Sequence, residues 1–185
     1  MDQFLEQVVV KQKRGVETAM FVMANVMMVV FGLLAFLALQ NVSLYLRAEG
    51  FSGNTIFFIA QLLLTGAACV LLFLRRDHIR MEYEYTFTNA QMDFAQVFNN
   101  KKRKALGTMN IRNVEACGLV SSGSFKRYIS MEGIKRTNWF LNRDAELLYF
   151  YFQKENQKRI IIIEPSEEMI SLIKRNLPQG IWQVN

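Results

Sequence analysis

Two long apolar runs near the N-terminus dominate the pattern of hydrophobic and polar positions. No residue is charged over residues 18–46 or 50–74. Each run exceeds the roughly 20 residues that an α-helix needs to cross the hydrocarbon core of a bilayer. Both runs are apolar on all sides, as lipid-facing helices must be. The pattern therefore predicts a transmembrane helical hairpin within residues 17–80, with its spans at residues 18–39 and 55–74.

Two other interpretations of these runs fit the sequence less well. A buried core hairpin would need a second layer of structure around both helices, and a chain of 185 residues leaves little for that layer. A cleaved signal peptide has a shorter apolar run that is followed by a small-x-small cleavage site. We therefore expect both helices to persist in the protein.

The charges that flank the two runs predict their orientation. Basic residues gather before the first run and after the second, whereas the loop between them holds one cation and one acid. Because cations concentrate on the cytoplasmic side of membrane proteins, we expect a multi-pass protein of the cell (cytoplasmic) membrane with both termini in the cytoplasm. The flanking cations are Lys11, Lys13, Arg14, Arg75, Arg76 and Arg80.

The first residues have an amphipathic pattern of their own. Within residues 1–16, Phe4, Leu5, Val8 and Val9 share one side of a helical wheel. This spacing predicts a short cytoplasmic helix that lies at the membrane surface and ends near Gly15. A disordered tail is the alternative.

Residues 81–185 alternate between apolar and polar side chains, with the period of two that half-buried antiparallel strands show. A 16-residue loop at residues 121–136 interrupts the series. An amphipathic helix follows Pro165 and Ser166 and stops at Pro178. The seven predicted strands cover residues 82–88, 91–98, 104–109, 114–120, 137–141, 146–153 and 159–164.

This order of elements resembles the pleckstrin-homology-like (PH-like) barrel. The segments MEYEYTFTNAQMDF and LLYFYFQKENQKRIIIIEPSEEMISLIKRNLP, with the opening MDQFLEQVVVKQKRG, make the chain similar to small bacterial two-span membrane proteins that carry a cytoplasmic PH-like domain. The resemblance implies an α+β fold, in which a transmembrane hairpin precedes a seven-stranded antiparallel barrel or sandwich, capped by a C-terminal helix, at residues 81–185. Members of this group mostly have no assigned function, so it implies no catalytic residue.

Positive charge is concentrated in the predicted domain. Residues 1–74 hold equal numbers of acids and cations, so the formal charge of +6 belongs to the rest of the chain. If the strands run up and down in sequence order, alternate turns face the membrane, and a cation near an anionic leaflet contributes about 1 kcal/mol. The cations of these turns are Lys101, Lys102, Arg103, Lys104, Lys126, Arg127, Lys135, Arg136, Lys154, Lys158 and Arg159, against Glu132 and Glu155.

We predict that the first eight of these cations, Lys101 to Arg136, contact the anionic inner leaflet of the bilayer. Solvated turns and contacts with a protein partner are the alternatives. Nucleic-acid binding would require exposed aromatic side chains on a basic sheet face, and the aromatics here are expected in the core. PH-like domains that bind phosphoinositides carry cations at the first strand turn, which here reads TNAQ. The resemblance therefore does not imply recognition of inositol phosphates.

The remaining chemistry favours a binding or scaffolding module over an enzyme, with no metal or cofactor expected. Cys69 lies in the second span and Cys117 in the predicted cytoplasmic domain, neither belongs to a metal-ligand spacing, His78 is the single histidine, and no catalytic motif is present. Within the spans, Asn25 and Thr65 have similar depths and are expected to pair. Gln61 has no partner at its own depth, which predicts a homodimer or another membrane protein as partner. An accessory subunit of a membrane complex and, less favoured, a membrane enzyme are the alternative functions.

Overall fold

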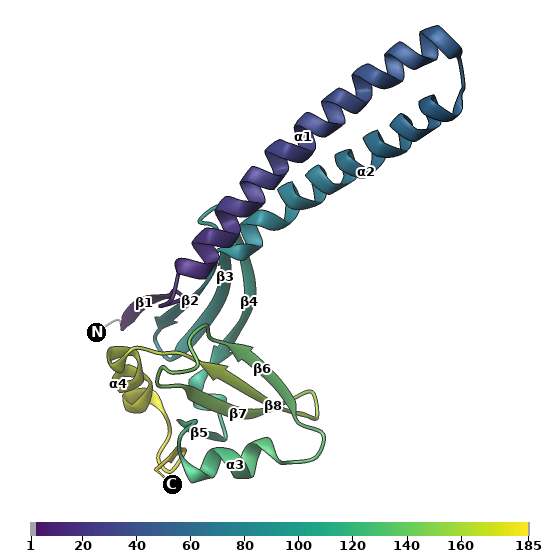
Figure 1. The fold of residues 1–185 in the computed structure, drawn as a ribbon. Coiled ribbons are helices and arrows are strands. Elements are labelled where there is room, and N and C mark those ends of the chain that lie inside the picture. The colour runs from purple at the N-terminus through teal and green to yellow at the C-terminus, as the bar shows by residue number, and fades with distance from the viewer. Residues whose placement is uncertain (1–2, 185) are drawn as a thin grey trace. The chain divides into compact units, whose positions relative to one another are not determined.

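The computed structural model describes residues 3–184, and the chain divides into two compact units (Figure 1). One unit is the continuous segment Lys13–Arg80. The other combines Met1–Gln12 with Met81–Asn185. The N-terminal residues therefore belong with the C-terminal part of the chain.

The first unit is a helical hairpin of α1 (Gly15–Glu49) and α2 (Gly53–Arg75), which is followed by the short helix η1 (Arg76–Ile79). By length and composition, both long helices could cross a membrane. Most of their apolar side chains are exposed. The turn is tight, because Thr55 Oγ1 donates a hydrogen bond to the Gly50 carbonyl at 2.8 Å. Helix α1 continues to Glu49, well beyond the predicted end of the first span at residue 39.

The second unit contains two β-sheets and two α-helices. Sheet A has the order β1-β2-β3-β4 and sheet B the order β6-β8-β7-β5-β9. The strands are β1 (Phe4–Val9), β2 (Met81–Thr88), β3 (Gln91–Phe98), β4 (Lys102–Asn110), β5 (Ala116–Leu119), β6 (Lys135–Trp139), β7 (Leu148–Lys154), β8 (Gln157–Ile163) and β9 (Trp182–Gln183). The helices are α3 (Gly123–Ile129), α4 (Glu167–Asn176) and the short η2 (Ile111–Asn113). The predicted α+β fold is thus confirmed.

Strand β1 corrects the prediction of a surface helix at the N-terminus. It pairs antiparallel with β2, with Leu5 opposite Phe87 and Val9 opposite Tyr83. Val9 is 4% exposed, whereas Val8 is 48% exposed. The segment therefore follows the two-residue period of a strand, because the β-branched run Val8–Val10 suits a pleated surface and the free edge of β2 offers a pairing partner.

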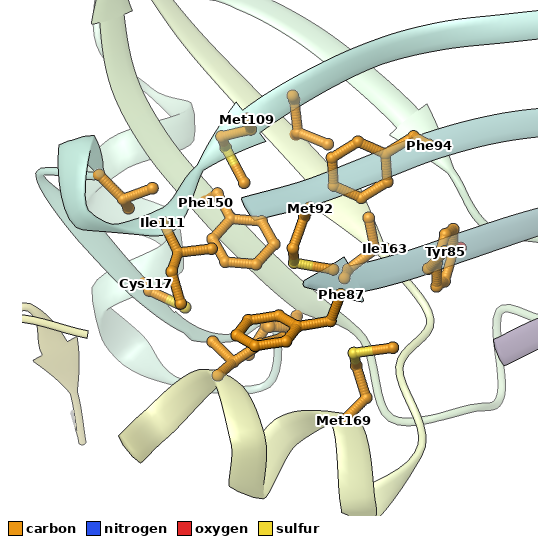
Figure 2. Packing of buried hydrophobic residues seen from close by; sticks show 14 of the residues in the cluster. Tyr85, Phe87, Met92, Phe94, Met109, Ile111, Cys117, Phe150, Ile163 and Met169 are labelled. Atoms are coloured by element: carbon orange, nitrogen blue, oxygen red, sulfur yellow. The ribbon is translucent and has the colours of Figure 1, made fainter. Parts of the chain in front are cut away.

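The core lies between the two sheets and α4 (Figure 2). Phe87 and Met92 of sheet A, Phe150 and Ile163 of sheet B, and Met169 of α4 are all fully buried. Helix α4 begins with a capped first turn, in which the Met169 amide donates to Ser166 Oγ at 3.2 Å. The predicted C-terminal helix and its buried apolar face are confirmed.

Sheet B departs from the simple up-and-down order that the sequence suggested. Strand β6 pairs parallel with β8, and β7 pairs antiparallel with both β8 and β5. Strands β5 and β6 therefore run in the same direction within sheet B, although they do not pair with each other. The chain must cross over the sheet between them. The predicted loop at residues 121–136 supplies this crossover and contains α3.

Candidate functional site

The cationic segment Lys101–Lys104 lies at the hairpin between β3 and β4. Asn99 and Asn100 form the turn with φ values of 49° and 53°, a left-handed conformation that asparagine tolerates better than most residues. The amide of Lys101 closes the turn by donating to the Phe98 carbonyl at 3.0 Å. The other three cations already belong to β4. The prediction of a turn is therefore wrong for Lys102 and Arg103, whereas Lys104 lies in a strand as the predicted strand 104–109 has it, and all four side chains are exposed.

The cationic segment lies at the end of sheet A where β1 ends and β2 begins. At this end the chain leaves the sheet for α1 and returns to it from η1. Met81, the first residue of β2, lies opposite Phe98, and Phe98 lies opposite Lys102. At the same end, Val9 closes β1 opposite Tyr83. Arg103 is the one cation of the segment with an acidic partner among the described residues, since its Nε lies 2.8 Å from Glu84 Oε2.

The remaining predicted lipid contacts lie elsewhere in the domain. Lys126 and Arg127 belong to α3, whose Phe125 and Tyr128 pack against the outer face of sheet B. Lys135 and Arg136 begin β6, and Arg136 Nε donates to Asn138 Oδ1 at 2.9 Å. The structure thus separates the eight predicted residues into three groups, because β6 follows a crossover rather than a hairpin.

A groove of about 540 Å³ lies between sheet A and sheet B, and we call it the β4–β6 groove. Its sheet A side is the second half of β4, residues 106–110, which carries no charge. Its opposite side comes from β6, β7 and β8. The apolar side chains of the groove include Phe94, Trp139, Phe152 and Ile161.

The charged side chains that line the β4–β6 groove are all basic. They are Lys135, Lys154 and Arg159, from three different strands, and no Asp or Glu joins them among the described lining residues. Pairing brings two of them together, because Lys135 lies opposite Arg159 in the parallel register. The Nε atom of Arg159 is buried without a hydrogen-bond partner. Three basic side chains without a lining acid favour an occupant that carries negative charge.

The shape of the groove depends on a close approach between the sheets. A Cβ atom at Gly107 would lie 3.8 Å from the ring of Trp139, so β4 passes directly beside this indole. The Trp139 ring also packs against Phe94, with ring centroids 4.7 Å apart. The carbonyl of Trp139 accepts a hydrogen bond from the Tyr85 hydroxyl. Burial raises the pKa of that hydroxyl far above its ordinary value, so it remains protonated and able to donate.

A buried carboxylate fixes the chain just beyond β6. Oε2 of Glu164 accepts hydrogen bonds from the amides of Leu141 and Asn142 at 3.1 Å and 2.9 Å. Its Oε1 accepts from Asn142 Nδ2 at 2.7 Å. The side chain of Gln7 in β1 donates to the Glu164 carbonyl and accepts from the Ser166 amide. Glu164 thus connects sheet B, α4 and β1.

The polar residues of the helical hairpin make different pairs from those predicted. Asn25 Nδ2 donates to the Phe21 carbonyl, and its Oδ1 accepts from Arg76 at 2.9 Å. The Thr65 hydroxyl donates to the carbonyl of Gln61 within α2. The expected pair of Asn25 and Thr65 is therefore wrong, because the guanidinium of Arg76 reaches Asn25 and Thr65 bonds within its own helix.

The thiols and acids of the described residues do not form a metal centre. Both cysteines are free, and burial raises the pKa of the Cys117 thiol. No group of three or more His, Cys, Asp or Glu side chains within residues 3–184 could hold a metal ion. The β4–β6 groove and the exposed cationic segment are two candidate ligand sites of the second unit.

Comparison with known families agrees with this architecture. The profile of the bacterial PH-like domain (DUF6106) matches residues 1–183. The chain belongs to this family. The match confirms the resemblance seen in the sequence and assigns both units of this bacterial PH-like protein to a single family. No curated protein and no solved structure shows a significant match.

Sequence reasoning missed the β4–β6 groove of this bacterial PH-like protein and the role of Glu164. The groove forms between strands of different sheets, so no local motif marks it. Glu164 has no local signal either, because acids are mostly exposed and its partners Leu141 and Asn142 lie 23 and 22 positions earlier in the chain.

Proposed function

We propose that the protein is a membrane-anchored, non-enzymatic binding module. In this proposal α1 and α2 span the cell membrane, both termini lie in the cytoplasm, and the cationic segment Lys101–Lys104 contacts the anionic inner leaflet. The single observation that supports it best is the position of this exposed segment. It lies at the end of sheet A from which the chain continues into the helices, and short links on both strands would tether that end near the lipid surface.

The lipid contact is tested with a soluble chain in which Gln3–Gln12 is joined by a flexible linker to Met81–Asn185. Replacing Lys101, Lys102, Arg103 and Lys104 by Glu should lower its binding to anionic phosphatidylglycerol vesicles by at least about tenfold, since each cation near such a surface contributes about 1 kcal/mol. Cosedimentation measures the bound fraction. Added salt should weaken vesicle binding by the unaltered chain. Neutral vesicles should bind neither the unaltered chain nor the variant.

A control variant with the same change of charge separates a local contact from a general charge effect. Four exposed cations elsewhere are replaced by Glu in this control, and it should retain most of the vesicle binding. Equal losses in the two variants, or equal binding of all chains, would contradict the proposed contact. The control positions are Arg112, Arg143, Lys174 and Arg175.

Assembly with another membrane protein is the second candidate function, and Gln61 favours it. The described residues provide no hydrogen bond to its carboxamide, and a polar side chain in lipid gains about 0.6–2 kcal/mol from a hydrogen-bonding partner. We expect Gln61→Cys, in a Cys69→Ser background, to cross-link two copies in a native membrane. Leu63→Cys on the opposite side of α2, 68% exposed, is the control and should not cross-link. Equal cross-linking at both positions would argue against a specific helix contact.

A further inference from the structure

The two halves of β4 differ in how they protect the edge of sheet A. Within the described residues, β4 is an outer strand of this sheet, as β6 is of sheet B. The first half carries Lys102, Arg103 and Lys104, and charged side chains are a common protection against the addition of another strand. The second half, residues 106–110, carries no charge and lines the β4–β6 groove. The unprotected half of the edge therefore coincides with a cavity.

The dimensions of this edge suit an extended chain. Five strand residues extend over about 17 Å at roughly 3.4 Å per residue. A small anion would occupy only part of that length, whereas a peptide strand could hydrogen-bond along all of it. The apolar surface of Trp139 and Phe152 offers a place for a side chain of such a peptide.

The charge of the groove specifies the sequence of the peptide. Lys135 and Lys154 are exposed, and Arg159 has a buried Nε without a partner. No Asp or Glu lies among the described residues that line the groove. Carboxylates of an incoming chain would pair with these cations.

We propose that the β4–β6 groove binds an extended acidic segment of a partner protein, which adds as a strand to residues 106–110 of β4. Its carboxylates face Lys135, Lys154 and Arg159, and one apolar side chain packs against Trp139. This inference rests on the proposed role of the domain as a binding module, but it does not depend on lipid contact by the cationic segment. It assigns the two basic regions to different ligands.

The test uses the full chain in nanodiscs of neutral phosphatidylcholine and a displayed library of random ten-residue peptides. We expect selection to enrich sequences in which Asp or Glu alternates with apolar residues. Selected peptides should bind with a change in tryptophan fluorescence. Two methylated forms of such a peptide should differ. Methylation of every second backbone nitrogen should abolish binding where it blocks the amides that pair with β4, and should preserve binding where it blocks the other set.

Two variants with equal changes of charge locate the site. Lys135→Glu with Lys154→Glu should weaken binding of the selected peptide by about tenfold or more, since two attractive contacts become repulsive. Lys101→Glu with Lys102→Glu should leave peptide affinity within about twofold, because these residues lie outside the groove. All four positions are exposed, and a thermal melt confirms that each variant is folded.

The possible outcomes separate this inference from the proposed lipid contact. A library that yields no acidic peptides, equal tolerance of both methylation patterns, or equal effects of the two double variants would overturn strand addition in the groove. Strand addition would also be overturned if the variant with Lys135→Glu and Lys154→Glu kept its affinity for the peptide and lost binding to anionic vesicles. Failure of vesicle binding alone, with peptide binding intact, would reject only the lipid contact.

Discussion

A chain that begins at Met81 is expected to fold poorly, whereas joining Gln3–Gln12 to Met81 through a flexible linker should restore a stable domain. The reason is that β1 is an outer strand of sheet A and pairs along the whole of its length with β2. Removing it exposes the edge of β2 and the surface that Val9 and Leu5 cover. Burial of one Val or Leu side chain contributes about 1.5–3 kcal/mol, so the loss should exceed about 3 kcal/mol.

Polar contacts from the same segment add to this expected loss. Gln7 connects β1 to the start of α4 through Glu164 and Ser166. The Gln12 amide donates to Asn142 Oδ1 at 2.9 Å, and Asn176 Nδ2 donates to the side chain of Gln3. Thermal melts followed by tryptophan fluorescence should therefore give a much lower melting temperature for the shorter chain. Melting temperatures within about 3 °C of each other would contradict the structural role of β1.

A pair of substitutions tests the strand register itself. Val9→Asp should destabilise the joined chain strongly, because Val9 is 4% exposed. Val8→Asp should be tolerated, because that side chain is 48% exposed on the opposite face. A surface helix would place both valines on one face, so similar effects of the two substitutions would favour the helix over the strand.

The sequence predicted best those elements whose partner is the next segment along the chain. Strands β2 and β3 lie where the alternation of Tyr83, Tyr85 and Phe87 and the turn at Asn89 placed them. Both residues of that turn, Asn89 and Ala90, have positive φ. Helix α4 likewise has local signals, since Ser166 caps it and acids occupy its first turn. Such elements are determined largely by side chains within a few residues.

The errors concern elements whose partner is distant in the sequence. Strand β1 pairs with β2, which follows both long helices in the sequence. The short pattern of β1, Phe4–Val9, is compatible with a helix as well as a strand. Strand β6 looked like the next strand of a meander, but α3 carries the chain across sheet B to pair β6 with β8. Because the β4–β6 groove requires this crossover, its cations could be identified from the sequence but could not be brought together.

Loss of the Glu164 carboxylate is expected to destabilise the domain more than the loss of any exposed acid. In Glu164→Ala the amides of Leu141 and Asn142 lose their acceptor in a region where Glu164 is only 8% exposed. Leaving a buried donor without a partner costs about 1–3 kcal/mol, so two of them should lower the free energy of unfolding by about 2–6 kcal/mol. Urea denaturation of the joined chain measures the difference.

Glu146→Ala is the matched control, because it removes the same charge from an exposed position in the same unit. It should change the free energy of unfolding by less than about 0.5 kcal/mol. Glu164→Gln should fall between the two, since it keeps one acceptor oxygen but directs an amide donor at the other site. Equal stability of Glu164→Ala and Glu146→Ala would show that the hydrogen bonds of Glu164 contribute little. If the expected order holds, Glu164→Ala should also weaken peptide binding in the β4–β6 groove, because Leu141 and Asn142 fix the chain directly after Trp139.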